Sequence, residues 1–211
     1  MYPICSPMPP AADSLSGSVE HVAASPHARR IPGEAGIWVF IFGDMLVFSL
    51  FFLTFVYYRG QDPELFHRSQ GALNQVLGAL NTVLMLTSSW CVATGVALAR
   101  RGWHRAVARC FGLAFLCGLG FVVIKYFEYS EKIHAGVTLT TNDFFMYYYM
   151  FTGIHLMHVL IGMGVLAFMT RYAAAGGIDA RKMVHIESGA SFWHVVDLLW
   201  IVLFALLYLL G

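Results

Sequence analysis

The sequence has few charged residues and lacks the cysteine patterns that indicate a disulfide framework or a zinc site. Only 12% of the 211 residues are charged and 58% are hydrophobic, whereas a soluble domain is usually about 25% charged. The four cysteines form no CxxC motif and no Cys/His spacing, and three of them lie in apolar runs. A formal net charge of +1 gives no indication of a nucleic-acid partner. Lipid is therefore the expected main solvent.

The first 35 residues differ from the rest of the chain. They are rich in Pro, Ser and Ala, contain no long apolar run, and lack the apolar core of a secretory signal peptide. We predict a disordered cytoplasmic tail over residues 1–35 and a membrane domain over residues 36–211.

Five stretches are long and apolar enough to cross a bilayer, which takes about 20 residues per helix. Backbone groups in hydrocarbon must bond to one another, so each stretch is expected to be a helix. The predicted fold is an all-α integral membrane bundle of five transmembrane helices. The spans are Gly36–Tyr58, Leu73–Ala99, Ala106–Tyr129, Phe144–Tyr172 and Ser188–Leu210.

The distribution of Lys and Arg predicts the orientation. With five spans, nine basic residues fall on the amino-terminal side and three on the other, and Lys125 lies within the third span. We therefore expect the amino terminus in the cytoplasm and the carboxyl terminus outside the membrane.

Polar side chains inside the spans fall into two predicted layers, because depth follows from a rise of about 1.5 Å per residue. Such residues usually face the interior of a bundle. The inner layer comprises Asp44, His194 and Asp197. The outer-to-middle layer comprises Asn81, Lys125, Glu128 and His155.

Three pairs within these spans are separated by three residues and so share a helix face. They are Lys125 with Glu128, His194 with Asp197, and His155 with His158. The pairs either neutralise each other and fix helix packing or handle protons. Asp44 has no basic residue within a turn. It either donates a hydrogen bond to another helix as a protonated acid or exchanges protons.

The histidines allow a second type of site to be considered. A di-iron bundle requires Glu-x-x-His motifs, and none occurs here. A haem could be held by His155 or His158 together with His194. No metal site or catalytic residue is predicted for the chain itself.

Several motifs together resemble a known family. In chain order they are GIWVFIFGDMLVFSLFF, ALNTVLMLTSS, FEYSEKI, TGIHLMHVLIGM and HIESGASFWHVVDLLWIVLFALLYLLG, and this order is the same as in cytochrome c oxidase subunit III. The resemblance covers roughly residues 34–211 and corresponds to a five-helix form that lacks the first two helices of longer members. It places Asp44 at a buried family glutamate. The other matching positions are Asn81, Thr82, Glu128, His155, His158, Glu187, His194, Asp197 and Trp200.

This resemblance implies a non-catalytic accessory subunit of a respiratory haem–copper oxidase-type complex in a bacterial-type inner membrane. Such a subunit supports electron transport, proton uptake and stability of the catalytic large subunit. The haem, with copper or non-haem iron, belongs to that partner, and phospholipid is a further ligand of the family. The missing helices remove part of the lipid-holding cleft.

The Gly43–Asp44 pair, the short length and the opening from Pro32 to Gly36 resemble the branch associated with nitric oxide reductase and denitrification. The terminal acceptor stays open at this stage between oxygen and nitric oxide. Two other functions stay open at this stage, an independent His-ligated haem membrane protein and a small transporter. The absence of an inverted repeat disfavours the transporter.

Overall fold

The chain is helical almost throughout the part that the structure describes. The computed structural model describes residues 35–176 and 179–210. Within them, five helices are long and apolar enough to cross a membrane, which confirms the predicted fold. The expected tail lies outside the described residues apart from Ala35. The elements are α1 (Ala35–Gln61), α2 (Pro63–Gly71), α3 (Gln75–Arg100), α4 (His104–His134), α5 (Asp143–Ala174), α6 (Ala180–Phe204) and the short π-helical segment η1 (Ala205–Leu209).

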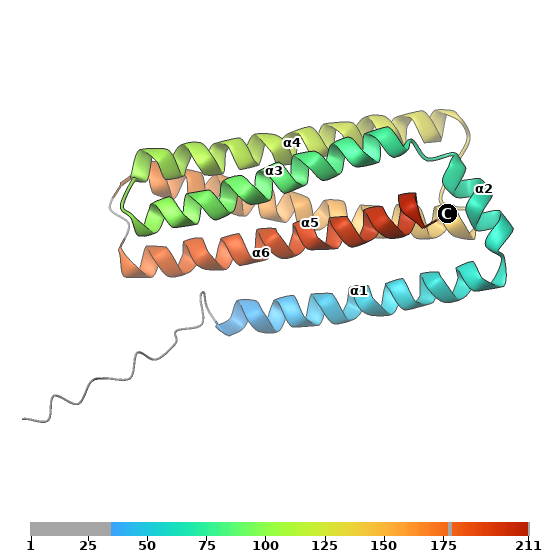
Figure 1. The fold of residues 1–211 in the computed structure, drawn as a ribbon, viewed down its shortest axis with the longest axis horizontal. Coiled ribbons are helices and arrows are strands. Elements are labelled where there is room, and N and C mark those ends of the chain that lie inside the picture. Colours follow the sequence, from blue (N-terminus) through green and yellow to red (C-terminus); the bar gives the residue numbers. More distant parts are fainter. Residues whose placement is uncertain (1–34, 177–178, 211) are drawn as a thin grey trace, which may run out of the picture. The chain divides into compact units, whose positions relative to one another are not determined.

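Four of the long helices form a closed bundle. The most extensive contacts join α3 to α4, α4 to α5, α5 to α6 and α6 back to α3. Figure 1 shows α1 running beside this bundle, next to α6, with α2 leading from α1 to α3 at one end. In the most apolar stretch of α1 only 17% of the residues are buried, whereas in the corresponding stretch of α5 44% of the residues are buried. The first helix is therefore peripheral.

Local sequence determines where the helices begin and end. The side chain of Asn74 accepts hydrogen bonds from the backbone N–H groups of Val76 and Leu77, which caps the start of α3. Asn142 caps α5 in the same way through Phe145. After α3 the chain reverses at Gly102, whose φ of 78° favours glycine over any other residue. These turns allow consecutive helices to pack antiparallel.

The helices differ from the sequence prediction at several points, and most of them extend beyond the predicted spans. The polar link after the first span contains the helix α2, which starts with Pro63 behind the capping side chain of Asp62. The last span was predicted to begin at Ser188, but α6 begins at Ala180. Hydropathy marks only the part of a helix that faces lipid, so polar helical turns outside the membrane escape it.

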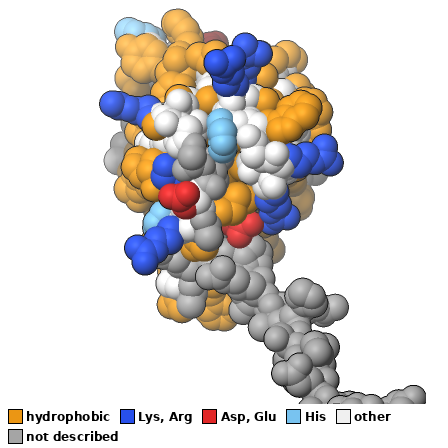
Figure 2. Space-filling view, turned by 90° about the vertical axis from the view of Figure 1, so that its left-hand side faces the viewer, with side chains coloured by type: hydrophobic (Ala, Val, Ile, Leu, Met, Phe, Trp, Pro, Cys, Tyr) orange, Lys and Arg blue, Asp and Glu red, His pale blue; other side chains and the backbone are white. Residues whose placement is uncertain are grey.

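Basic side chains collect at one end of the helices. The turn between α3 and α4 and the segment between α5 and α6 lie at the end where α1 begins (Figure 1). Figure 2 faces this end and shows Lys and Arg side chains around it. The described basic residues on this side are Arg100, Arg101, Arg105, Arg109, Arg171, Arg181 and Lys182. The opposite side carries Arg59, Arg68 and Lys132.

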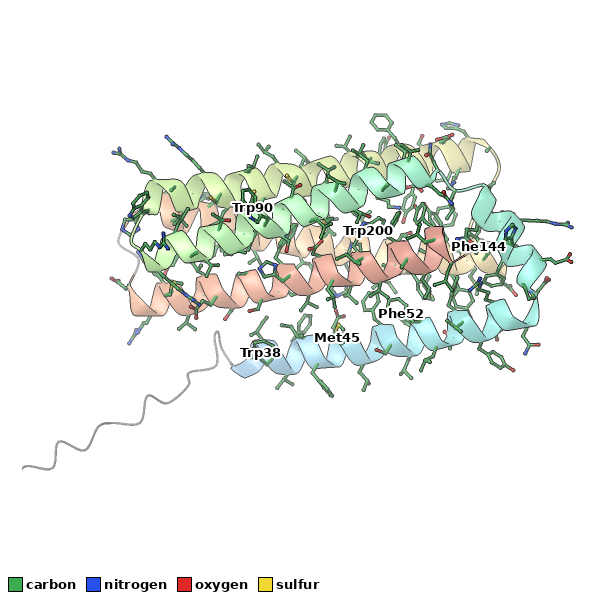
Figure 3. All side chains as sticks on the ribbon, viewed as in Figure 1. Trp38, Met45, Phe52, Trp90, Phe144 and Trp200 are labelled. Atoms are coloured by element: carbon green, nitrogen blue, oxygen red, sulfur yellow. The ribbon has the colours of Figure 1, made fainter. Side chains whose placement is uncertain are left out.

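Aromatic side chains attach α1 to the bundle. Phe52 points from α1 toward the other helices (Figure 3) and meets Phe151 of α5 edge-on at 5.9 Å. Phe55 is buried and also meets Phe151, at the same centroid distance. The opposite side of α1 is exposed and apolar, as at Val39 and Phe42. Such a face suits a lipid environment.

Candidate functional site

A buried ion pair lies in the interior of the bundle. Lys125 Nζ donates to Glu128 Oε2 at 2.9 Å, and both side chains are 1% exposed. Tyr208 of η1 completes the group, because its hydroxyl accepts from Lys125 at 2.9 Å and donates to Glu128 at 2.6 Å. We call Lys125, Glu128 and Tyr208 the lysine cluster. The predicted pairing of Lys125 with Glu128 is confirmed, whereas Tyr208 was missed.

Trp200 covers the lysine cluster on one side. The ammonium group of Lys125 lies 4.8 Å from the centre of the Trp200 ring system, a distance at which an aromatic face attracts a cation. The indole N–H of Trp200 donates to Thr82 of α3 at 3.1 Å. The family-motif residues Thr82 and Trp200 thus connect α3, α4 and α6. The arrangement neutralises a charge pair and fixes the packing of these helices.

Two further polar side chains are fully buried. His155 packs between the rings of Phe121 and Trp200, at centroid distances of 5.7 and 5.5 Å. Asn81 lies next to Thr82 on α3. Neither side chain has a protein hydrogen-bond partner among the described residues. Both belong to the predicted outer-to-middle layer, and the enclosure of His155 by aromatic rings indicates a packing role.

Asp44 has a partner that the sequence did not reveal. Its Oδ1 lies 3.2 Å from Nε2 of His158 on α5. The predicted inner layer instead combined Asp44 with His194 and Asp197, and helix spacing paired His158 with His155. The i,i+3 spacing predicted a shared face, but His158 turns toward α1 whereas His155 points into the core.

The predicted pair of His194 and Asp197 forms no direct ion pair among the described residues, and both side chains approach Ser89 of α3. His194 Nδ1 lies 2.6 Å from the hydroxyl oxygen of Ser89 on α3. Asp197 is 4% exposed, and its Oδ1 has no hydrogen-bond partner within residues 35–176 and 179–210. The neighbouring Ser88 accepts from the indole of Trp193 at 3.0 Å. His194 and Trp193 of α6 therefore both bond across to α3.

Glu187 lies near the basic end of the helices. Its carboxylate accepts two hydrogen bonds from Arg100 of α3, at 2.9 and 3.2 Å. The Arg100 side chain is 61% exposed, so the pair contributes little to stability. It joins the end of α3 to α6.

The histidine positions bear on the haem hypothesis. His155 lies between aromatic rings, His158 faces Asp44 and His194 bonds to Ser89. His158 and His194 thus make polar contacts through their ring nitrogens, whereas both ring nitrogens of His155 lack a hydrogen-bond partner among the described residues. In the described part of the chain, no three His, Cys, Asp or Glu side chains form a metal-binding group.

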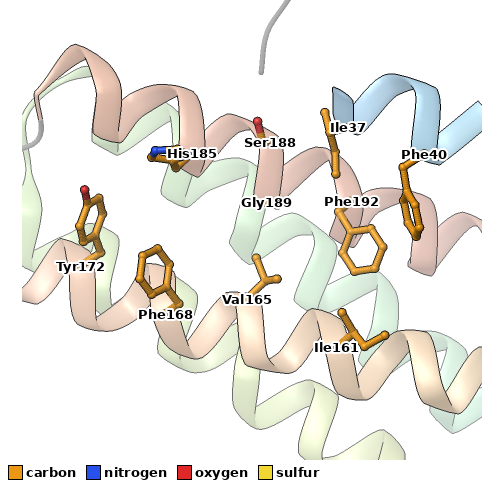
Figure 4. Close-up of a pocket in the computed structure, with 10 residues that line it drawn as sticks. All are labelled: Ile37, Phe40, Ile161, Val165, Phe168, Tyr172, His185, Ser188, Gly189 and Phe192. Carbon is orange, nitrogen blue, oxygen red and sulfur yellow. The ribbon is translucent and has the colours of Figure 1, made fainter. Parts of the chain in front are cut away.

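An apolar groove lies among α1, α5 and α6. Its volume is about 460 Å³. Figure 4 shows Tyr172 and His185 toward one end and Phe40 and Phe192 toward the other. The remaining lining residues are Ile37, Ile161, Val165, Phe168, Ser188 and Gly189. The groove offers mainly hydrocarbon contact with a few polar groups.

Comparison with known proteins identifies the family. The family model described as cytochrome c oxidase subunit III matches residues 21–211. The chain belongs to the cytochrome c oxidase subunit III family. This confirms the expected function at the level of the family, a subunit III of a haem–copper oxidase. Members of the family typically carry no redox centre of their own.

Several relatives support the assignment to subunit III. The chain is 27% identical to cytochrome c oxidase subunit 3 of Synechocystis sp., over 97% of this chain and 99% of that protein. It is also 27% identical to quinol oxidase subunit 3 of Bacillus subtilis, over 83% of this chain and 86% of that protein. A protein of Aeropyrum pernix named heme-copper oxidase subunit I+III is 23% identical over 94% of this chain, which corresponds to 24% of that protein.

Proposed function

We propose that this subunit III is an accessory subunit that binds the catalytic large subunit, stabilises it and supports its proton uptake. The observation that carries the proposal is the match of the family model to residues 21–211. The Aeropyrum pernix relative, whose name combines subunits I and III, supports a direct association with the catalytic subunit. In the bundle interior Lys125 is paired with Glu128 and His155 is enclosed by aromatic rings, which suits a structural role for these groups.

The proposal also concerns which electron donor and which terminal acceptor the complex uses. Relatives named as cytochrome c oxidase and quinol oxidase subunits have equal identity to the chain, so identity does not separate the two donors. The association with nitric oxide reductase rests on the sequence, on Gly43–Asp44 and the opening from Pro32 to Gly36. The partner's cofactors, haem with copper or haem with non-haem iron, distinguish an oxidase from a nitric oxide reductase.

Phospholipid is the proposed ligand of the apolar groove. Its walls from α1, α5 and α6 suit an acyl chain. The ammonium of Lys182 lies 4.9 Å from the ring of Tyr172. Positive charge is therefore available for a phosphate group at the end of the groove that Tyr172 lines. Extraction and analysis of lipid from the purified complex tests this part. We expect phospholipid to remain bound after purification, and complete loss of phospholipid in mild detergent would contradict the proposal.

The experiment that tests the function is purification of the tagged chain in mild detergent, with a visible spectrum of the complex and of the separated chain. We expect haem to accompany a large co-purifying subunit and the separated chain to be colourless. Haem retained by the separated chain would contradict the proposal in favour of a His-ligated membrane protein. A chain without any large partner that supports ion flux in liposomes would favour a transporter.

A further inference from the structure

Two fully buried polar side chains project into the interior of the four-helix bundle from different helices. Asn81 of α3 and His155 of α5 are both 0% exposed. The amide oxygen and nitrogen of Asn81 and both ring nitrogens of His155 have no hydrogen-bond partner within residues 35–176 and 179–210. We propose that these four atoms form a binding site for water, which bridges α3 and α5 through the centre of the bundle.

The register of α3 and α4 places Asn81 at the level of His155. Ser88 of α3 donates to the carbonyl oxygen of Ala114 of α4 at 3.0 Å. Asn81 lies two helical turns before Ser88, on the same helix face, and Phe121 lies two turns after Ala114. Because the two helices run antiparallel with the same rise per residue, Asn81 and Phe121 lie at the same level. Phe121 in turn packs edge-on against His155 at 5.7 Å.

The helices that carry the two side chains occupy opposite corners of the bundle. The extensive contacts of α3 and of α5 are with α4 and α6, so the central axis of the bundle lies between α3 and α5. Trp200 of α6 borders this axis, because its ring lies 5.5 Å from the ring of His155. Its indole N–H donates to Thr82, the neighbour of Asn81 in sequence. Asn81 and His155 therefore approach the axis at one level from opposite sides.

Water matches the chemistry of the four unpartnered atoms. The Asn81 amide presents N–H donors and an acceptor oxygen, and a neutral imidazole presents one donor and one acceptor. A metal ion binds acceptors only, whereas water both donates and accepts. Ordered water is the usual partner of buried polar groups that have no partner in the protein. The lysine cluster does not compete for these atoms, since Lys125 and Glu128 bond to each other and to Tyr208.

Bound water at this position joins two helices across the diagonal of the bundle. The direct hydrogen bonds described above link neighbouring helices, such as α3 with α6 through Thr82 and Trp200. A water bridge between Asn81 and His155 fixes α3 relative to α5 as well. The site consists of side chains of this chain alone, so it goes beyond the proposed association with a catalytic subunit and does not depend on it.

The test is solid-state NMR of the assembled complex with nitrogen-15 in histidine, which measures magnetisation transfer from water to the ring N–H of His155. The signal is assigned by its disappearance in His155→Phe. We expect transfer from water in the wild type. We expect Asn81→Leu to abolish this transfer, because leucine has a similar volume to asparagine but no polar atom to hold the water.

Met85→Leu is the matched control. Met85 lies one turn after Asn81 on α3 and is also 0% exposed, and the substitution exchanges one apolar side chain for another of similar size. It should leave the transfer to His155 unchanged. The proposal is overturned if the wild type shows no transfer from water to His155. It is equally overturned if Asn81→Leu shows as much transfer as the wild type.

A second measurement on the wild-type complex decides the question if Asn81→Leu does not assemble. It is a density map at a resolution that shows ordered water. Density for water within hydrogen-bond distance of both Asn81 and His155 supports the proposal. A direct hydrogen bond between the two side chains, or no water density between them, overturns it.

Discussion

Lys125 shows how a charge is accommodated in the interior of a membrane bundle. Its ammonium donates to Glu128 and to Tyr208, and it lies against the face of Trp200. The Tyr208 hydroxyl in turn donates to the second oxygen of Glu128. Each charged atom therefore has a partner, which limits the cost of removing both charges from water.

We expect Glu128→Gln to destabilise the protein, because it leaves the buried charge of Lys125 without a counter-ion. Breaking one side of such a pair costs about 3–5 kcal/mol. Thermal unfolding of the purified protein in detergent measures the loss. Glu131→Gln is the control, since Glu131 lies on the same helix and is exposed, and a surface change of this kind is worth about 0.5 kcal/mol or less. Equal melting temperatures for the two variants would contradict a buried pair.

At the scale of the helices, glycine permits a close approach between α5 and α6. A Cβ atom at Gly162 would lie 2.7 Å from Cε3 of Trp193, a large buried ring that cannot easily move. At Gly164, two residues further on the same helix, a Cβ atom would meet nothing within 4 Å. Of these two glycines, only Gly162 is required for packing within the described part of the chain.

Gly162→Ala should therefore separate α5 from α6 and destabilise the protein by about 1–3 kcal/mol, the usual cost of overpacking. Gly164→Ala should be neutral or stabilising by up to about 1 kcal/mol, because alanine is the better helix former. Melting temperatures of both variants in the same detergent check this. A greater loss for Gly164→Ala than for Gly162→Ala would show that the close contact with Trp193 is wrong.

The first helix is attached to the protein less extensively than the other four spans. Its contacts with the bundle include the aromatic rings around Phe151, the approach of Asp44 to His158 and the contact of Phe40 with Phe192. This limited attachment leaves the apolar groove between α1, α5 and α6.

At the scale of the whole molecule, the unequal charge of the two ends predicts the orientation in the membrane. Seven described Lys and Arg residues lie at the end where α1 begins (Figure 2), against three at the other end. We expect a reporter that works only in the cytoplasm to be active when it is fused to the amino terminus. A reporter that works only outside the cytoplasm should be active when it is fused to the carboxyl terminus. The reverse pattern would disprove the orientation.

The sequence predicted which polar residues are buried better than it predicted which side chains they contact. Lys125 and Glu128 lie three residues apart on one helix, so their pairing follows from helix geometry. The same spacing gave the wrong partner for His194 and for His158, because each of them bonds to a different helix. Tyr208 was missed since it is embedded in an apolar run and has no polar neighbour in sequence.

The sequence by itself determined that this protein is an all-α membrane protein with five spans, and its motifs identified the family. The reason is that hydrocarbon forces each apolar segment to satisfy its own backbone hydrogen bonds, which makes the spans a local property. Only the tertiary structure decided that Asp44 faces His158, that Ser89 faces His194 and that Tyr208 joins Lys125. These contacts link helices about 80 to 115 residues apart, and neither periodicity nor hydropathy specifies which faces meet.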